Sequence, residues 1–69
     1  MKTGDRVWIR QIELEGEIVP FLPADKYFDP TIFARVKYFH KEEEGQRKPR
    51  KYSKIFYLSD LVLVIPSLF

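Results

Sequence analysis

Apolar and polar residues alternate along much of this 69-residue chain, a pattern typical of strands with one buried face. In the segment 6–10, for example, Val7 and Ile9 fall on one face, whereas Trp8 falls on the other with two arginines. Runs of this kind predict five short strands and no helix. The expected strands are 6–10, 16–19, 32–40, 51–57 and 61–65.

The connections between these strands are rich in turn-forming residues. The segment 20–31 contains three prolines and two aspartates, which predicts a long loop and excludes a long helix. Pro20 indicates that the second strand either ends there or lies at a sheet edge. A charged connection with Gly45 and Pro49 makes the third and fourth strands a hairpin, and residues 58–60 are expected to form a 3-10 turn.

Length and composition favour one small folded domain, residues 1–69. Hydrophobic residues make up 45% of the chain and charged residues 32%, which is a globular rather than a disordered profile. A core of this size supplies only about 3–5 kcal/mol, so oligomerisation is a natural support. The chain has no cysteine, no expected signal peptide and no long apolar run, so we expect a cytoplasmic protein with no membrane span.

Positive charge is concentrated in the second half of the chain. Residues 1–30 contain four Lys or Arg against six Asp or Glu, whereas residues 31–69 contain eight against four. The net charges are therefore −2 and +4. Five cations follow one another without an intervening acid, at Arg47, Lys48, Arg50, Lys51 and Lys54.

Three short motifs resemble those of SH3-like small barrels, including KOW and Tudor-type modules. They are Gly-Asp-Arg-Val at 4–7, Gly-Glu-Ile-Val at 16–19 and Phe-Tyr-Leu-Ser-Asp-Leu-Val-Leu at 56–63. The resemblance implies an all-β, five-stranded SH3-like barrel with one long proline-rich loop and a short 3-10 turn before the last strand. Residues 10–15 lack the additional glycine of a KOW module.

The first two motifs also resemble the plasmid-borne, trimethoprim-insensitive type II dihydrofolate reductases. These are SH3-like barrels that assemble into a tetramer with one active pore. Their functional strand carries Val-Gln-Ile-Tyr, whereas this chain has Lys-Ile-Phe-Tyr at 54–57, without the glutamine. An oligomeric reductase of this kind is retained as a remote alternative.

Side chains suited to catalysis are few. His40 is the only histidine, and Ser53, Ser59 and Ser67 lie outside any nucleophile motif. Three consecutive glutamates at 42–44 are more typical of a solvated hairpin tip than of a cation site. We therefore expect a protein that is not an enzyme and that holds no metal and no cofactor.

Apolar residues on both faces of the expected strands point to a protein interface. The expected core comprises Val7, Ile9, Ile18, Ala34, Val36, Ile55, Leu61 and Leu63. This assignment leaves outside Trp8, Phe33, Phe39, Phe56, Val62 and Val64, with an apolar tail at 67–69. Exposed apolar surface of this extent marks interaction sites, unless the long loop covers part of it.

The first functional hypothesis is therefore an adaptor that binds a protein partner, itself included, through an aromatic outer face. Its proposed binding residues are Trp8, Tyr27, Phe28, Phe39 and Phe56. Tyr27 and Phe28 lie in the long loop, where they either fold back as a lid or remain exposed in a binding groove.

The second hypothesis is nucleic-acid binding through the basic segment 47–54. The five cations suit phosphate contacts, and Tyr52 or Trp8 suits base stacking. Arg35, Lys37 and Trp8 are expected to extend this surface if they share the outer face. The competing interpretation is a charged tip that protects the sheet edges, beside glutamates that repel phosphate.

Overall fold

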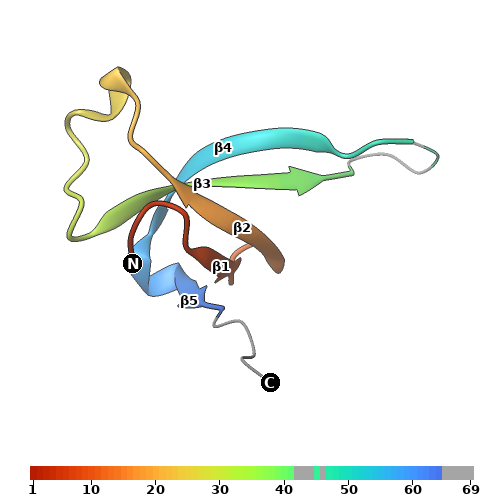
Figure 1. Ribbon diagram of the computed structural model, residues 1–69, viewed down its shortest axis with the longest axis horizontal. Coiled ribbons are helices and arrows are strands. Elements are labelled where there is room, and N and C mark those ends of the chain that lie inside the picture. Colours follow the sequence, from red (N-terminus) through yellow and green to blue (C-terminus); the bar gives the residue numbers. More distant parts are fainter. Residues whose placement is uncertain (42–44, 46, 65–69) are drawn as a thin grey trace.

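The protein folds as one antiparallel sheet, shown by a computed structural model that describes residues 1–41, 45 and 47–64 (Figure 1). The described strands are β1 (Arg6–Ile9), β2 (Leu14–Val19), β3 (Phe33–His40), β4 (Arg50–Tyr57) and β5 (Leu61–Leu63). Two 3-10 turns accompany them, η1 (Pro23–Asp25) and η2 (Leu58–Asp60). The predicted all-β class, the β3–β4 hairpin and the 3-10 turn before the last strand are confirmed.

The strand order is β4-β3-β2-β1-β5, so β4 and β5 form the two edges of the sheet. This arrangement is compatible with an SH3-like fold. The sheet formed by the described strands is open, and closure into a barrel is not observed. β2 is a central strand that ends at Val19, so Pro20 marks its end rather than a sheet edge.

One face of the sheet, called here the inner face, carries the hydrophobic core. Its buried residues are Val7, Ile9, Ile18, Ala34, Val36, Tyr38, Phe56 and Leu61. The predicted positions of Ile55 and Phe56 are wrong: Phe56 is only 6% exposed, and Ile55 lies on the opposite, outer face. Leu63, also predicted in the core, is exposed.

Pairing with β3 is what fixes the faces of β4. Ala34 of the inner face lies opposite Phe56, and Arg35 of the outer face lies opposite Ile55. Because side chains alternate along a strand, this register places Tyr52 and Lys54 on the inner face with Phe56.

Gly16 allows β2 and β3 to approach each other closely. A Cβ atom at this position would overlap Val36 Cγ1 and would lie 2.7 Å from the Lys37 carbonyl oxygen. The glycine is therefore required by packing rather than by a turn.

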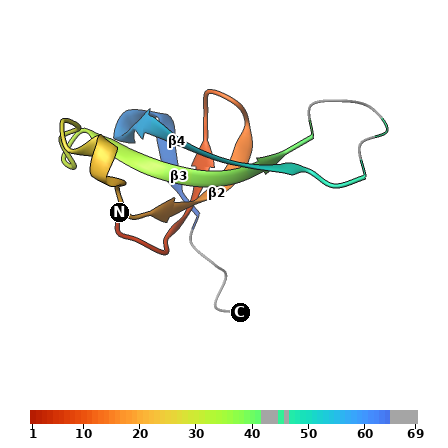
Figure 2. The same ribbon diagram turned by 90° about the horizontal axis from the view of Figure 1, so that it is seen from above.

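The β3–β4 hairpin extends beyond the rest of the sheet. The pairing of β3 with β2 stops where Tyr38 meets Gly16, whereas β3 and β4 remain paired as far as His40 and Arg50. This leaves a two-stranded projection that is prominent in Figures 1 and 2. We call it the arm: the hairpin from the Tyr38–Tyr52 pair outward.

The segment between β2 and β3 is the predicted long loop, with η1 as its only described 3-10 turn. Asp25 of η1 is buried against Arg35 of β3. The loop lies at the opposite end of the hairpin from the arm (Figure 1). No helix in the described part of the chain is long and apolar enough to cross a membrane.

Candidate nucleic-acid interface

The aromatic residues proposed for protein binding do not form one surface. Phe56 is part of the core, so its predicted place on the outer face is wrong. Phe28 lies near the start of β3, where its ring packs edge-on against Phe33 with centroids 5.1 Å apart. Phe39 lies on β3 six residues after Phe33, which is a distance of about 20 Å along the strand.

The two loop aromatics differ in their surroundings. Phe28 folds back onto Phe33, whose ring also contacts Tyr57 with centroids 4.7 Å apart. Tyr27 is 86% exposed, and the Nζ atom of Lys26 lies 5.1 Å from its ring centroid. Phe28 therefore covers part of the Phe33 ring, whereas the Tyr27 ring remains exposed.

Trp8 belongs to a separate apolar strip near the other edge of the sheet. It lies directly opposite Val62 of β5, and both side chains are 39% exposed. A charged row separates this strip from the Phe33 cluster, because Arg6, Glu17 and Lys37 are successive cross-strand neighbours on the outer face.

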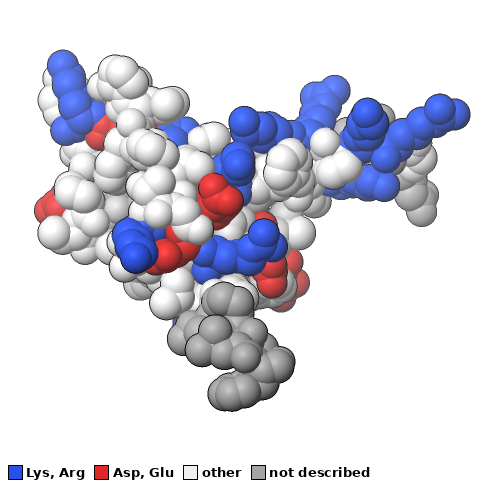
Figure 3. Space-filling model, viewed as in Figure 1, with Lys and Arg blue, Asp and Glu red and all other residues white. Residues whose placement is uncertain are grey.

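The basic residues, in contrast, lie together on the arm and at its base (Figure 3). All five cations singled out in the sequence are exposed: Arg47, Lys48, Arg50, Lys51 and Lys54. Arg50 and Lys54 lie on the inner face with Tyr52, and Lys51 lies on the outer face. The described residues of the arm include no acid, and the glutamates at 42–44 lie outside the described residues.

Arg35 does not extend this basic surface as predicted. Its guanidinium donates hydrogen bonds to Asp25 and to Ser53, so its role is to stabilise the fold. Lys37 does lie on the outer face beside β4, where its Nζ atom is 3.9 Å from a carboxylate oxygen of Glu17.

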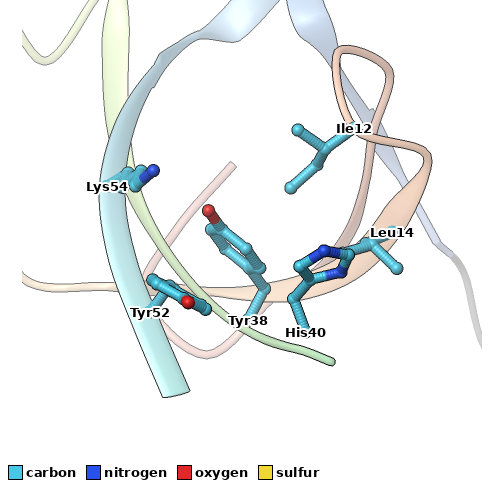
Figure 4. Close-up of a pocket in the computed structure, with 6 residues that line it drawn as sticks. All are labelled: Ile12, Leu14, Tyr38, His40, Tyr52 and Lys54. Atoms are coloured by element: carbon cyan, nitrogen blue, oxygen red, sulfur yellow. The ribbon is translucent and has the colours of Figure 1, made fainter. Parts of the chain in front are cut away.

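A hollow of about 200 Å³ lies on the inner face where the arm meets the body of the protein (Figure 4). Tyr38 and Tyr52 stack within it, with ring centroids 5.5 Å apart and an interplanar angle of 21°. The Nζ atom of Lys54 lies 5.5 Å from the Tyr52 centroid. The complete lining is Ile12, Leu14, Tyr38, His40, Tyr52 and Lys54.

The hollow was not predicted from the sequence, although Tyr52 and Lys54 were both singled out. Tyr38 and His40 are two positions apart on β3, and so are Tyr52 and Lys54 on β4. This spacing places each pair on one face, but only the register brings Tyr38 opposite Tyr52. Ile12 joins them from the turn between β1 and β2.

The described side chains do not assemble a catalytic group of the serine–histidine kind. Ser53 lies on the outer face opposite Lys37, whereas His40 lies on the inner face. Within the described ranges, no cluster of three or more His, Asp or Glu residues is placed to hold a metal ion. Ser67 and the tail at 67–69 fall outside the described residues.

Comparison of the chain with protein-family models, with curated proteins and with solved structures gave no match.

Proposed function

We propose that this protein is a non-enzymatic binding module that uses its arm to bind single-stranded nucleic acid. The observation that carries the proposal is the gathering of four exposed cations on the arm, with a fifth, Lys54, at its base. The nucleic-acid hypothesis therefore ranks ahead of the protein-partner hypothesis, whose aromatic residues are divided between the core and separate surfaces. A cytoplasmic location is part of this proposal and rests on the absence of cysteine.

The geometry of the arm suits contacts with a phosphate backbone. Its cations project from both faces, with Arg50 on the inner face and Lys51 on the outer face. A strand of nucleic acid therefore meets positive charge on whichever face of the arm it follows. The displacement of counterions from phosphates makes such binding weaken as the salt concentration rises.

The test is fluorescence anisotropy with a labelled 12-nucleotide single strand, repeated over a series of salt concentrations. For three to five phosphate contacts we expect log K to fall against log salt with a slope of about −2 to −3.5. The double variant Arg50→Glu/Lys51→Glu is expected to abolish binding at moderate salt.

The matched control is Lys2→Glu/Lys26→Glu, which makes the same change in net charge away from the arm. It is expected to retain most of the affinity. Equal losses in the two double variants, or binding that does not respond to salt, would show that the arm is not the binding site.

A second function, self-association, is favoured by one specific observation. Trp8 of β1 and Val62 of the edge strand β5 form an exposed apolar pair. Burial of this pair against a second copy would add apolar area to a small core that has no disulfide.

A further inference from the structure

We propose that the hollow at the base of the arm holds one unpaired base of the bound strand. This inference rests on the proposed function of the arm and adds to it a reason for preferring single strands. A base inside a duplex is paired and stacked, and it enters a protein pocket only after it is extruded.

Stacking is the first property that suits the hollow to a base. Tyr38 and Tyr52 stack on each other with nearly parallel rings, and a base in the hollow would add a third ring to this aromatic pair. Tyr52 is half-buried, so part of its side chain is open to solvent. Bases stack on aromatic side chains with little regard to sequence, because every base has a π-face. Ile12, from the turn between β1 and β2, and Leu14, at the start of β2, supply an apolar wall (Figure 4).

Hydrogen bonding is the second property. The hydroxyl group of Tyr38 points into the hollow in Figure 4. Among the described residues, this hydroxyl has no hydrogen-bond partner. A hydroxyl both donates and accepts, so it can pair with either kind of group on the edge of a base.

Charge decides between a base of nucleic acid and another flat ligand. Arg50 and Lys54 flank Tyr52 on the same face of β4, and Lys54 itself lines the hollow. Each is exposed and is placed to contact a phosphate adjoining a base that occupies the hollow. The aromatic surface and the phosphate partners thus occur together on one face of one strand.

The test compares two 12-nucleotide strands with equal phosphate charge, one of thymidines and one of abasic residues. Loss of a stacked base is expected to weaken binding of the abasic strand by about 5- to 150-fold at the same salt concentration. Tyr52→Leu is expected to weaken binding of the thymidine strand to a similar degree and to leave the abasic strand almost unaffected.

Phe39→Leu is the matched control, because Phe39 is an exposed aromatic residue of the same arm on the outer face. It is expected to keep the affinity for thymidines within about twofold, well below the loss of a stacked base. Tyr38→Phe removes only the hydroxyl group of a buried ring. It is expected to weaken binding of the thymidine strand but not of the abasic strand. A circular dichroism melt of each variant confirms folding.

The outcomes separate this inference from the proposed function. Salt-dependent binding that is equal for the two strands and normal in Tyr52→Leu overturns the base-binding hollow and leaves the function of the arm standing. A loss in Phe39→Leu with normal binding by Tyr52→Leu places the bases on the outer face and also overturns it. Absence of salt-dependent binding by the unmodified chain overturns both.

Discussion

Arg35 of β3 binds the carboxylate of Asp25 through two parallel hydrogen bonds. Its Nε donates to Oδ2 at 2.6 Å, and its Nη2 donates to Oδ1 at 2.7 Å. The third guanidinium nitrogen, Nη1, donates to the carbonyl oxygen of Ser53 at 2.8 Å and to its Oγ at 3.0 Å. Asp25 also accepts from the backbone N–H of Leu22 at 2.7 Å. One arginine therefore ties the long loop to both strands of the hairpin.

Replacement of Arg35 by lysine is expected to lower the melting temperature by about 5–10 °C. Lysine keeps the charge but cannot form the paired hydrogen bonds or reach Ser53 with a second group. Thermal melting followed by circular dichroism measures the change. The matched control is Arg6→Lys, because the Arg6–Glu15 pair is exposed and 3.4 Å long, and we expect it to shift the melting temperature very little. Equal shifts in the two variants would contradict this role for Arg35.

Stability in acid is expected to depend on the same carboxylate. The hydrogen bonds from Arg35 lower the pKa of Asp25 and outweigh the opposing effect of burial, with a further contribution from the Leu22 N–H. A carboxyl whose pKa is lower in the folded state stabilises the protein above its unfolded pKa of about 3.9. This stabilisation is lost as the pH falls through the folded pKa. The pKa of Asp29 is also lowered, by hydrogen bonds from Thr31.

The measurement is the urea midpoint of the unmodified chain and of Asp25→Asn between about pH 6 and pH 2, on either side of the unfolded pKa. At pH 6 the unmodified chain is expected to be more stable than Asp25→Asn, and this difference in stability should shrink below about pH 4. Asp29→Asn separates the contribution of the second aspartate. A difference between the unmodified chain and Asp25→Asn that stays constant across this range would assign the effect of Asp25 to packing rather than to ionisation.

The turn between β1 and β2 has no glycine or proline, and β2 begins at Leu14 rather than at the predicted residue 16. The other strands could be predicted because turn-forming residues flank them and each has at least one alternating apolar face. The face of β4 could not, because Ile55 and Phe56 are both strongly apolar and the local pattern fits either orientation. Pairing with β3 decides between them, and a shift of one residue would exchange every side chain of β4 between the faces.

The candidate site shows the same boundary between local and long-range information. A run of cations such as Arg50 and Lys51 can be read directly from the chain, and so can the hairpin that carries it. The hollow depends on Tyr38 meeting Tyr52 across the hairpin and on Ile12 arriving from another turn. The ion pair of Arg35 with Asp25 could not be predicted either, because Asp25 lies in a loop whose path the sequence does not specify.

The reversed assignment of Ile55 and Phe56 leads to a direct test with neighbouring aromatic residues. Phe56→Leu removes buried atoms from the core and is expected to cost about 1–2 kcal/mol of unfolding free energy. Tyr57→Leu changes a ring that is exposed on the outer face and is expected to cost less than about 0.5 kcal/mol beyond the loss of its contact with Phe33. Urea unfolding gives both values. A larger cost for Tyr57→Leu would mean that β4 presents its other face to the core.

Self-association through the Trp8–Val62 strip is tested by light scattering coupled to size exclusion, at two salt concentrations. If the strip is buried between two copies, the oligomer is expected to persist at high salt, because apolar contacts are not screened. The double variant Trp8→Gln/Val62→Thr should then elute as a monomer. Tyr27→Gln is the control, since Tyr27 is the more exposed ring but lies on the loop, away from the strip. An unmodified chain that is monomeric at high concentration excludes this second function, and dissociation by Tyr27→Gln instead would move the interface to the loop.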